Sequence, residues 1–171
     1  EDLPTEKSPR FETLRARAGD AVMAVNFFGL RDMGIWSGWK LRNPGAILVQ
    51  NSSHAPFSPR AQGADFAFGS LRKWLPLPDG GFAEAEKPSE IFARPASSMP
   101  DFSADFLAAS AARSRGSGWE EFAEKLFYAA EAKISARKKP GRMGAYSFET
   151  LARLDIEKLA QRRFAAIRAF S

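Results

Sequence analysis

Residues 65–81 read DFAFGSLRKWLPLPDGG, and this stretch holds most of the information about fold and chemistry. Its first four residues, 65–68, continue from Asp65 into the apolar residues Phe66, Ala67 and Phe68 and predict a short strand. Pro76 and Pro78 follow and are expected to end regular structure. Lys73 therefore lies just beyond the carboxyl end of a predicted strand, three residues after Ser70.

Three more strands are predicted around this segment. Residues 21–26 and 46–50 are continuous apolar runs, as expected for strands covered on both faces, and residues 81–84 predict a further strand. A helix is predicted over 32–41 and another short one over 11–18. Strands that alternate with helical crossovers predict an α/β fold with a mainly parallel sheet flanked by helices.

The second half of the chain has a different pattern. Prolines and serines between 88 and 100 predict a surface connection. Helices are then expected over 102–113, 119–139 and 155–170, the last with Asp155 as its N-cap. The carboxyl-terminal half is therefore expected to be helical, and a length of 171 residues fits a single domain.

Composition excludes several classes of protein. The chain has no cysteine and one histidine, so disulfides and thiolate metal sites are excluded, and a reducing cytoplasm is the expected compartment. No apolar run approaches the ~20 residues of a membrane-spanning helix. The net charge of +5 is spread along the chain except for one basic run over 136–142. That run fits either a solvated helix end or a contact with phosphate or nucleic acid.

Polar residues follow each predicted parallel strand, at 26–29, 51–54 and 69–73. Ligands of open α/β sheets bind at the carboxyl ends of the strands, so the site is expected there. Lys73 is the residue of interest because a lysine amine among apolar neighbours can form a Schiff base with an aldehyde. A serine hydroxyl at position 70 could hold a phosphate of the same ligand.

These segments together resemble the large domain of fold-type-I pyridoxal-phosphate-dependent enzymes, the aspartate aminotransferase superfamily. The nearest likeness is to the sugar-aminotransferase-like DegT/DnrJ/EryC branch. Residues 65–81 look like the cofactor-lysine segment, and 26–29 look like the N-x-x-G turn after a central strand. Residues 47–54 look like the strand whose end carries the aspartate that faces the pyridine nitrogen. The three segments occur in the family's order.

The resemblance implies pyridoxal 5′-phosphate (PLP) as cofactor and a role for each matching residue. Lys73 would form the internal aldimine and shuttle protons, and Ser70 would bind the phosphate. Asn26 would lie near the phenolic oxygen, and His54 would reach the ring. An amino donor and a keto acceptor such as a keto sugar would be the substrates, and a homodimer the assembly, with no membrane or nucleic-acid partner.

Two departures from the family pattern keep other hypotheses open. Asn51 is a neutral amide where the family has a carboxylate, so the ring would be a weaker electron sink; this favours a related protein with impaired catalysis. The resemblance also implies that 1–171 is a partial large domain, with 101–171 leading toward a missing small domain. A third hypothesis is a basic, non-enzymatic binding module whose binding is salt-dependent and indifferent to Lys73.

Overall fold

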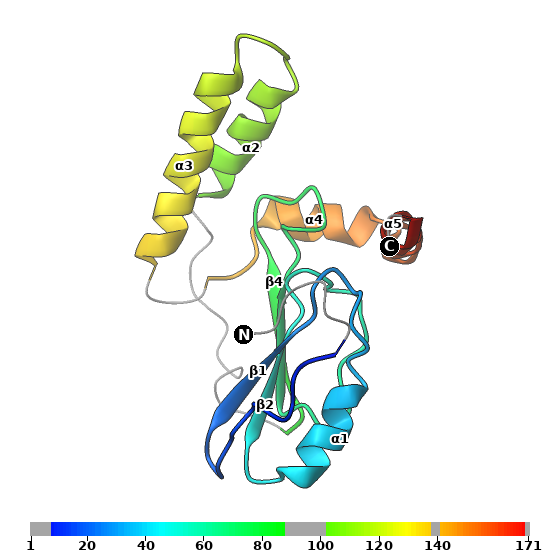
Figure 1. Ribbon diagram of the computed structural model, residues 1–171. Coiled ribbons are helices and arrows are strands. Elements are labelled where there is room, and N and C mark those ends of the chain that lie inside the picture. Colours follow the sequence, from blue (N-terminus) through cyan, green and yellow to red (C-terminus); the bar gives the residue numbers. More distant parts are fainter. Residues whose placement is uncertain (1–7, 88–101, 138–140, 170–171) are drawn as a thin grey trace. The chain divides into compact units, whose positions relative to one another are not determined.

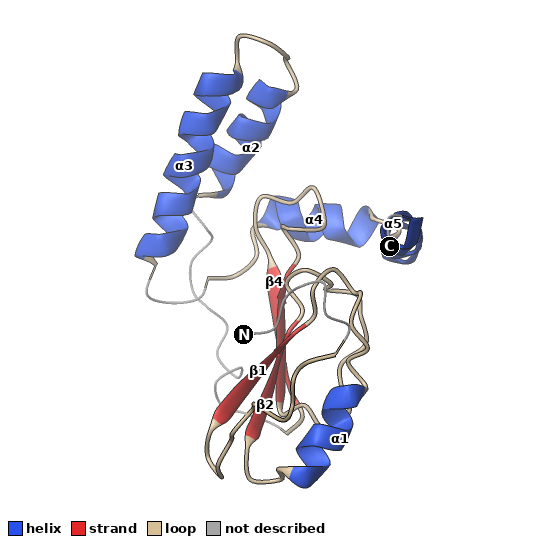
Figure 2. Cartoon of the chain, in the orientation of Figure 1, coloured by secondary structure: helices blue, strands red, loops and turns tan. Residues whose placement is uncertain are grey.

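The computed structural model describes residues 8–87, 102–137 and 141–169. Within them the chain is an α/β protein with a small sheet (Figures 1 and 2). Its strands are β1 (Ala21–Val25), β2 (Ile47–Asn51), β3 (Phe66–Ser70) and β4 (Gly81–Ala85). Its helices are α1 (Ile35–Arg42), α2 (Ser103–Arg113), α3 (Glu120–Ala136), α4 (Ala145–Arg153) and α5 (Ile156–Ala169).

The sheet follows the order of the chain, β1-β2-β3-β4. The first three strands are parallel, and β4 returns antiparallel to β3. In this register Val25 lies beside Asn51, and Asn51 beside Phe68. The prediction of an α/β fold with a mainly parallel sheet is confirmed, and the carboxyl ends of the three parallel strands meet at one edge.

Two tryptophans of α1 form the centre of the core against one face of the sheet. Trp36 and Trp39 are both buried and meet edge to face, with their ring centroids 5.7 Å apart. They pack with Ala24 of β1 and Leu48 of β2, which are fully buried. The small residue in β1 leaves room for the indole rings, so large and small side chains interlock across the layer.

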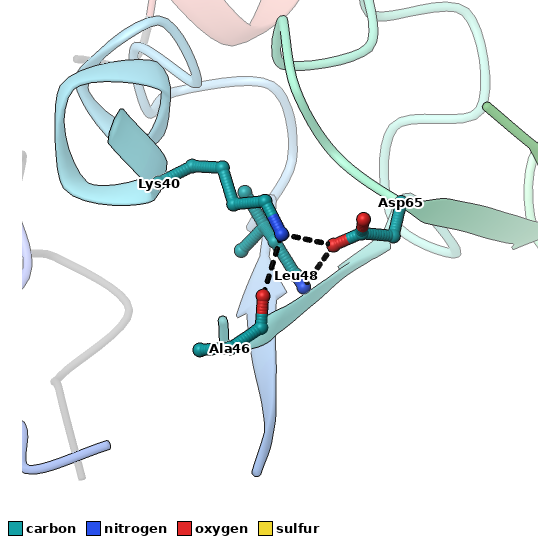
Figure 3. Close-up of polar contacts among 4 residues, drawn as sticks. All are labelled: Lys40, Ala46, Leu48 and Asp65. Carbon is teal, nitrogen blue, oxygen red and sulfur yellow. Dashed lines mark hydrogen bonds and ion pairs between the residues drawn. The ribbon is translucent and has the colours of Figure 1, made fainter. Parts of the chain in front are cut away.

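An ionic contact ties α1, β2 and β3 together at the amino end of the sheet (Figure 3). Asp65, directly before β3, accepts hydrogen bonds from the Leu48 N–H and from Lys40 Nζ, each at 2.7 Å. The same ammonium group donates to the carbonyl of Ala46. Partial burial opposes ionisation of Asp65, but the hydrogen bonds from Lys40 and Leu48 and the lysine charge outweigh it and lower the pKa of that carboxyl.

Some local predictions are wrong. Residues 11–18 form turns instead of a helix, with the Leu14 N–H bonded to the Phe11 carbonyl three residues before it. The Phe11 ring meets Trp36 edge to face at 5.0 Å, so tertiary packing overrides the local helical preference. Helix α4 was not predicted. The expected N-cap is confirmed, because Asp155 Oδ1 accepts the Lys158 N–H at 3.0 Å.

Other predictions extend beyond the described residues. The proposed connection over 88–100 lies outside them, as do the last residues of the helices expected over 119–139 and 155–170. In the part of the chain that is described, no helix is long and apolar enough to cross a membrane.

The chain divides into two compact units. The first contains the sheet, α1 and α5; the second contains α2, α3, α4 and residues 75–80. Within the second unit, Phe106 of α2 packs against Phe127 of α3, and Asp79 accepts hydrogen bonds from the Ser103 hydroxyl and the Gly144 N–H. The single domain expected for 1–171 stays a prediction.

We expect Asp65→Asn to lower the free energy of unfolding by about 1–2 kcal/mol at neutral pH, because it removes a partly exposed charged acceptor. Since folding lowers the pKa of Asp65, this stabilisation is fully present above the unfolded pKa of about 4 and is lost as the pH falls through the folded value. Urea unfolding at pH 7 and in acid measures the difference.

The matched control is Glu84→Gln, which neutralises an exposed carboxylate on β4. An Asp65→Asn variant as stable as the control variant at pH 7 would contradict the role of this contact.

Candidate functional site

Three polar residues lie together at the carboxyl edge of the sheet, as predicted. Asn26 follows β1, Asn51 ends β2 and Ser70 ends β3. Backbone bonds continue past the strands: the Asn26 N–H donates to the Asn51 carbonyl at 3.0 Å, and the Ser52 N–H donates to the Phe68 carbonyl at 2.8 Å. The strand ends are therefore fixed relative to one another.

The loop after β2 is held in place by Gln50, which is 1% exposed. Its Oε1 accepts the Ala61 N–H at 2.7 Å, and its Nε2 donates to the Ser52 hydroxyl at 2.8 Å. A buried amide must satisfy its hydrogen bonds, so one side chain fixes both ends of the 52–61 loop. This loop carries His54.

His54 and Lys73 are in direct contact. The distance from Lys73 Nζ to His54 Nε2 is 3.3 Å. The indole N–H of Trp74, the residue after the lysine, donates to the His54 carbonyl at 2.7 Å. Lys73 is exposed, yet its nitrogen faces an imidazole at the sheet edge where the site was predicted.

Phe28 packs against the face of the imidazole. Its ring stacks on His54 with centroids 5.0 Å apart and planes 20° apart. Phe28 is the residue with a left-handed backbone among the non-glycine residues described, at φ 54°. A bulky side chain in this region costs free energy, so the surrounding contacts must hold it there.

The surroundings favour the neutral form of His54. Desolvation first, and the positive charge of Lys73 second, lower the pKa of the imidazole below its ordinary 6.5. Its other nitrogen, Nδ1, is buried and has no hydrogen-bond partner among the described residues. A proton added at Nε2 would therefore lie next to the Lys73 ammonium group, and the Nδ1–H would have no hydrogen-bond partner among the described residues.

Asn26, at the same edge, also has a buried polar atom without a hydrogen-bond partner. It is 1% exposed, and its Oδ1 has no partner within the described ranges. A cavity of about 600 Å³ lies beside it, lined also by Ser58, Arg60 and Phe164. An unpaired buried acceptor beside a cavity fits a ligand that carries a donor such as a hydroxyl group.

Asn51 is engaged within its own loop. Its Oδ1 accepts the Ser53 N–H at 3.0 Å, and its Nδ2 lies 3.8 Å from the Met23 sulfur. Ser70 is half-buried at the end of β3. Direct side-chain contact among the predicted residues is thus found for His54 and Lys73, whereas Asn26, Asn51 and Ser70 are brought close by the strands that carry them.

Two aromatic side chains at the site, Phe164 and Phe28, were not predicted from the sequence. Phe164 of α5 lies over Trp74, with ring centroids 5.7 Å apart, and a methyl group added at Gly29 would fall 2.6 Å from its ring. Phe28 is half exposed and stacks on the histidine. The aromatic pair before Gly29 was a signal for Phe28; nothing local marked Phe164.

Comparison of the chain with protein-family models, with curated proteins and with solved structures gives no match. The described residues contain no cluster of three or more histidine, cysteine, aspartate or glutamate side chains that could hold a metal ion. The arrangement of the side chains themselves is therefore the basis for a functional proposal.

We expect Lys73→Met to raise the pKa of His54 toward 6.5, because the variant removes the nearby positive charge, with the desolvation part of the lowering retained. The chain has one histidine, so its C–H proton resonances can be followed by NMR titration without assignment. Lys73→Arg keeps the charge and is expected to move the pKa less. Equal pKa values in the Met and Arg variants would contradict the contact.

Proposed function

We propose that the protein is a PLP-dependent aminotransferase-like protein whose cofactor lysine is Lys73. The observation that carries the proposal is the position of the Lys73 amine, 3.3 Å from His54, at the edge where three parallel strands end. Ligands of open α/β sheets bind at this edge. The likeness of residues 65–81 to a cofactor-lysine segment supports the same assignment.

The residues at this edge fit the groups of PLP. When bound, PLP supplies an aldehyde that condenses with an amine and a ring that takes up electrons. Lys73 provides the amine, and the half-buried Ser70 a hydroxyl that can donate to a phosphate oxygen. The unpaired Oδ1 of Asn26 fits a phenolic hydroxyl group.

The cavity beside Asn26 is the proposed place for the substrate. It holds polar groups from the loops after β1 and β2, and the Phe164 ring lines it as well. Its volume of about 600 Å³ suits a small keto compound or a keto sugar.

A second candidate is a PLP-binding protein with weak or lost turnover. Asn51 stands where the family has a carboxylate, and its Oδ1 already accepts the Ser53 N–H. A neutral amide supplies no negative charge to the ring nitrogen, and each ~1.4 kcal/mol of lost stabilisation slows a step tenfold. This observation favours cofactor binding without efficient transamination.

The remaining parts of the proposal come from the resemblance. They are a PLP-transferase large domain and a homodimeric assembly. A cytoplasmic location is proposed from composition. The absence of cysteine from the sequence suits a reducing compartment.

We expect added PLP to give a visible absorption band, and borohydride to fix the label on Lys73. Peptide mapping of the reduced protein locates the label. Lys73→Ala is expected to lose the band and the mapped label, whereas Lys125→Ala, which removes an exposed lysine of α3, keeps both. Labelling spread evenly over surface lysines, and unchanged by Lys73→Ala, would rule out the assignment.

We expect Asn51→Asp to raise the rate of half-transamination of bound PLP by an amino acid at least about tenfold, because a carboxylate stabilises the protonated ring nitrogen. The carboxylate has the shape of the amide and can still accept the Ser53 N–H. Stopped-flow absorbance measures the rate. Asn51→Ala, which removes both groups, is the control, and equal rates in the Asp and Ala variants would argue against this role.

A further inference from the structure

We propose that His54 is the catalytic proton-transfer residue for condensation of carbonyl compounds with the amine of Lys73. The inference goes beyond the proposed function, because it requires an aldehyde but neither the phosphate nor the pyridine ring of PLP. It assigns to His54 a chemical role in addition to any contact with a cofactor ring.

The geometry carries the inference. The imidazole Nε2 lies 3.3 Å from Lys73 Nζ, within reach of a proton on the nitrogen that reacts. Gln50 fixes the loop that carries His54, and the Trp74 indole N–H fixes its carbonyl. Because the lysine precedes Trp74, the hydrogen bond between Trp74 and His54 ties the two segments together beside the reacting atoms.

The step needs two protons to move from nitrogen to oxygen. The neutral Lys73 amine attacks the carbonyl carbon, a C–N bond forms, and the π electrons of the C=O bond move to oxygen. His54 Nε2 takes a proton from the nitrogen and delivers it to the oxygen. A second transfer by the same route lets the oxygen leave as water and leaves a C=N bond, so no oxidant or reductant is required.

The surroundings keep the imidazole in the form that can accept a proton. Desolvation and the charge of Lys73 lower the pKa of His54, and a general base must be unprotonated before it can act. Two further cations stack on rings that contact this histidine or its backbone: Arg31 lies over Phe27, and Arg163 lies over Trp74.

Phe28 is the positioning residue of this pair. Its ring stacks on the imidazole, and its left-handed backbone is retained at a cost in free energy. The stack limits rotation of the imidazole and keeps Nε2 toward the lysine. Loss of the ring is expected to slow proton transfer without removing the transferring group.

The test uses 4-pyridinecarboxaldehyde, which lacks a neighbouring hydroxyl that could replace the histidine. The full chain is mixed with the aldehyde, reduced with borohydride at timed intervals, and mapped at Lys73 and at exposed Lys158. His54→Gln is expected to slow the approach to equilibrium at Lys73 at least about tenfold, since general acid–base catalysis contributes ~10²–10⁴. For Phe28→Leu we expect a labelling rate at Lys73 between those of the unsubstituted protein and His54→Gln.

A catalyst changes forward and reverse rates together, so the labelled fraction of Lys73 at equilibrium, and labelling of Lys158, should stay unchanged. An unchanged rate at Lys73 would overturn the inference. A fall in the equilibrium fraction that matches the fall in rate would also overturn it, since that result indicates a purely structural role.

A measurement on the unsubstituted protein covers the case in which a variant does not fold. Its labelling rate at Lys73 should change around the pKa of His54 that NMR gives. A pH–rate profile without a change at that pKa would overturn the inference. A PLP arm separates the two proposals. If condensation of the pyridine aldehyde depends on His54, but PLP binds no more tightly than that aldehyde, the role of His54 is supported and PLP is ruled out as the cofactor.

Discussion

The contact of Asp65 with Lys40 and the Leu48 N–H is the constraint on which the sheet edge depends. It joins helix α1 to β2 and to the start of β3 at the end of the sheet opposite the candidate site. Each strand is only five residues long, so a shift in strand register at one end of the sheet would displace the residues at the other end. The Asp65 carboxylate accepts a hydrogen bond from the Leu48 N–H. This bond fixes the pairing of Val49 with Phe66, and with it the position of Ser70.

At the opposite end of the sheet, polar groups replace apolar packing. Gln50 is buried, and its side-chain amide makes hydrogen bonds to Ser52, Pro59 and Ala61 that hold the loop carrying His54. Asn26 and His54 each keep one buried polar atom without a partner in the described parts of the chain. Buried polar atoms are usually paired, but Trp36 Nε1 and Ser147 Oγ also have no partner among the described residues, so an unpaired atom does not by itself mark a ligand site.

The left-handed backbone of Phe28 belongs to the same pattern. The turn from Asn26 to Gly29 has to leave β1 sharply and still place an aromatic ring against the imidazole. Gly29 continues the turn at φ 78°, and Phe164 approaches too closely for a side chain there. Local strain, a stacked histidine and a lysine amine therefore coincide, as is common where a site is held ready for its ligand.

Local sequence signals were enough to predict the four strands, the α/β class and the edge at which the candidate residues lie, because the sheet did not overrule the apolar runs and turn residues. It failed at residues 11–18, where contact of Phe11 with Trp36 outweighed helix preference, and it missed α4. Only the tertiary structure decided that His54 meets Lys73, that Phe28 stacks on the histidine and that Phe164 of α5 reaches Gly29. These partners are separated by 19 to more than 100 residues, and no periodicity in a sequence encodes a contact over such a distance.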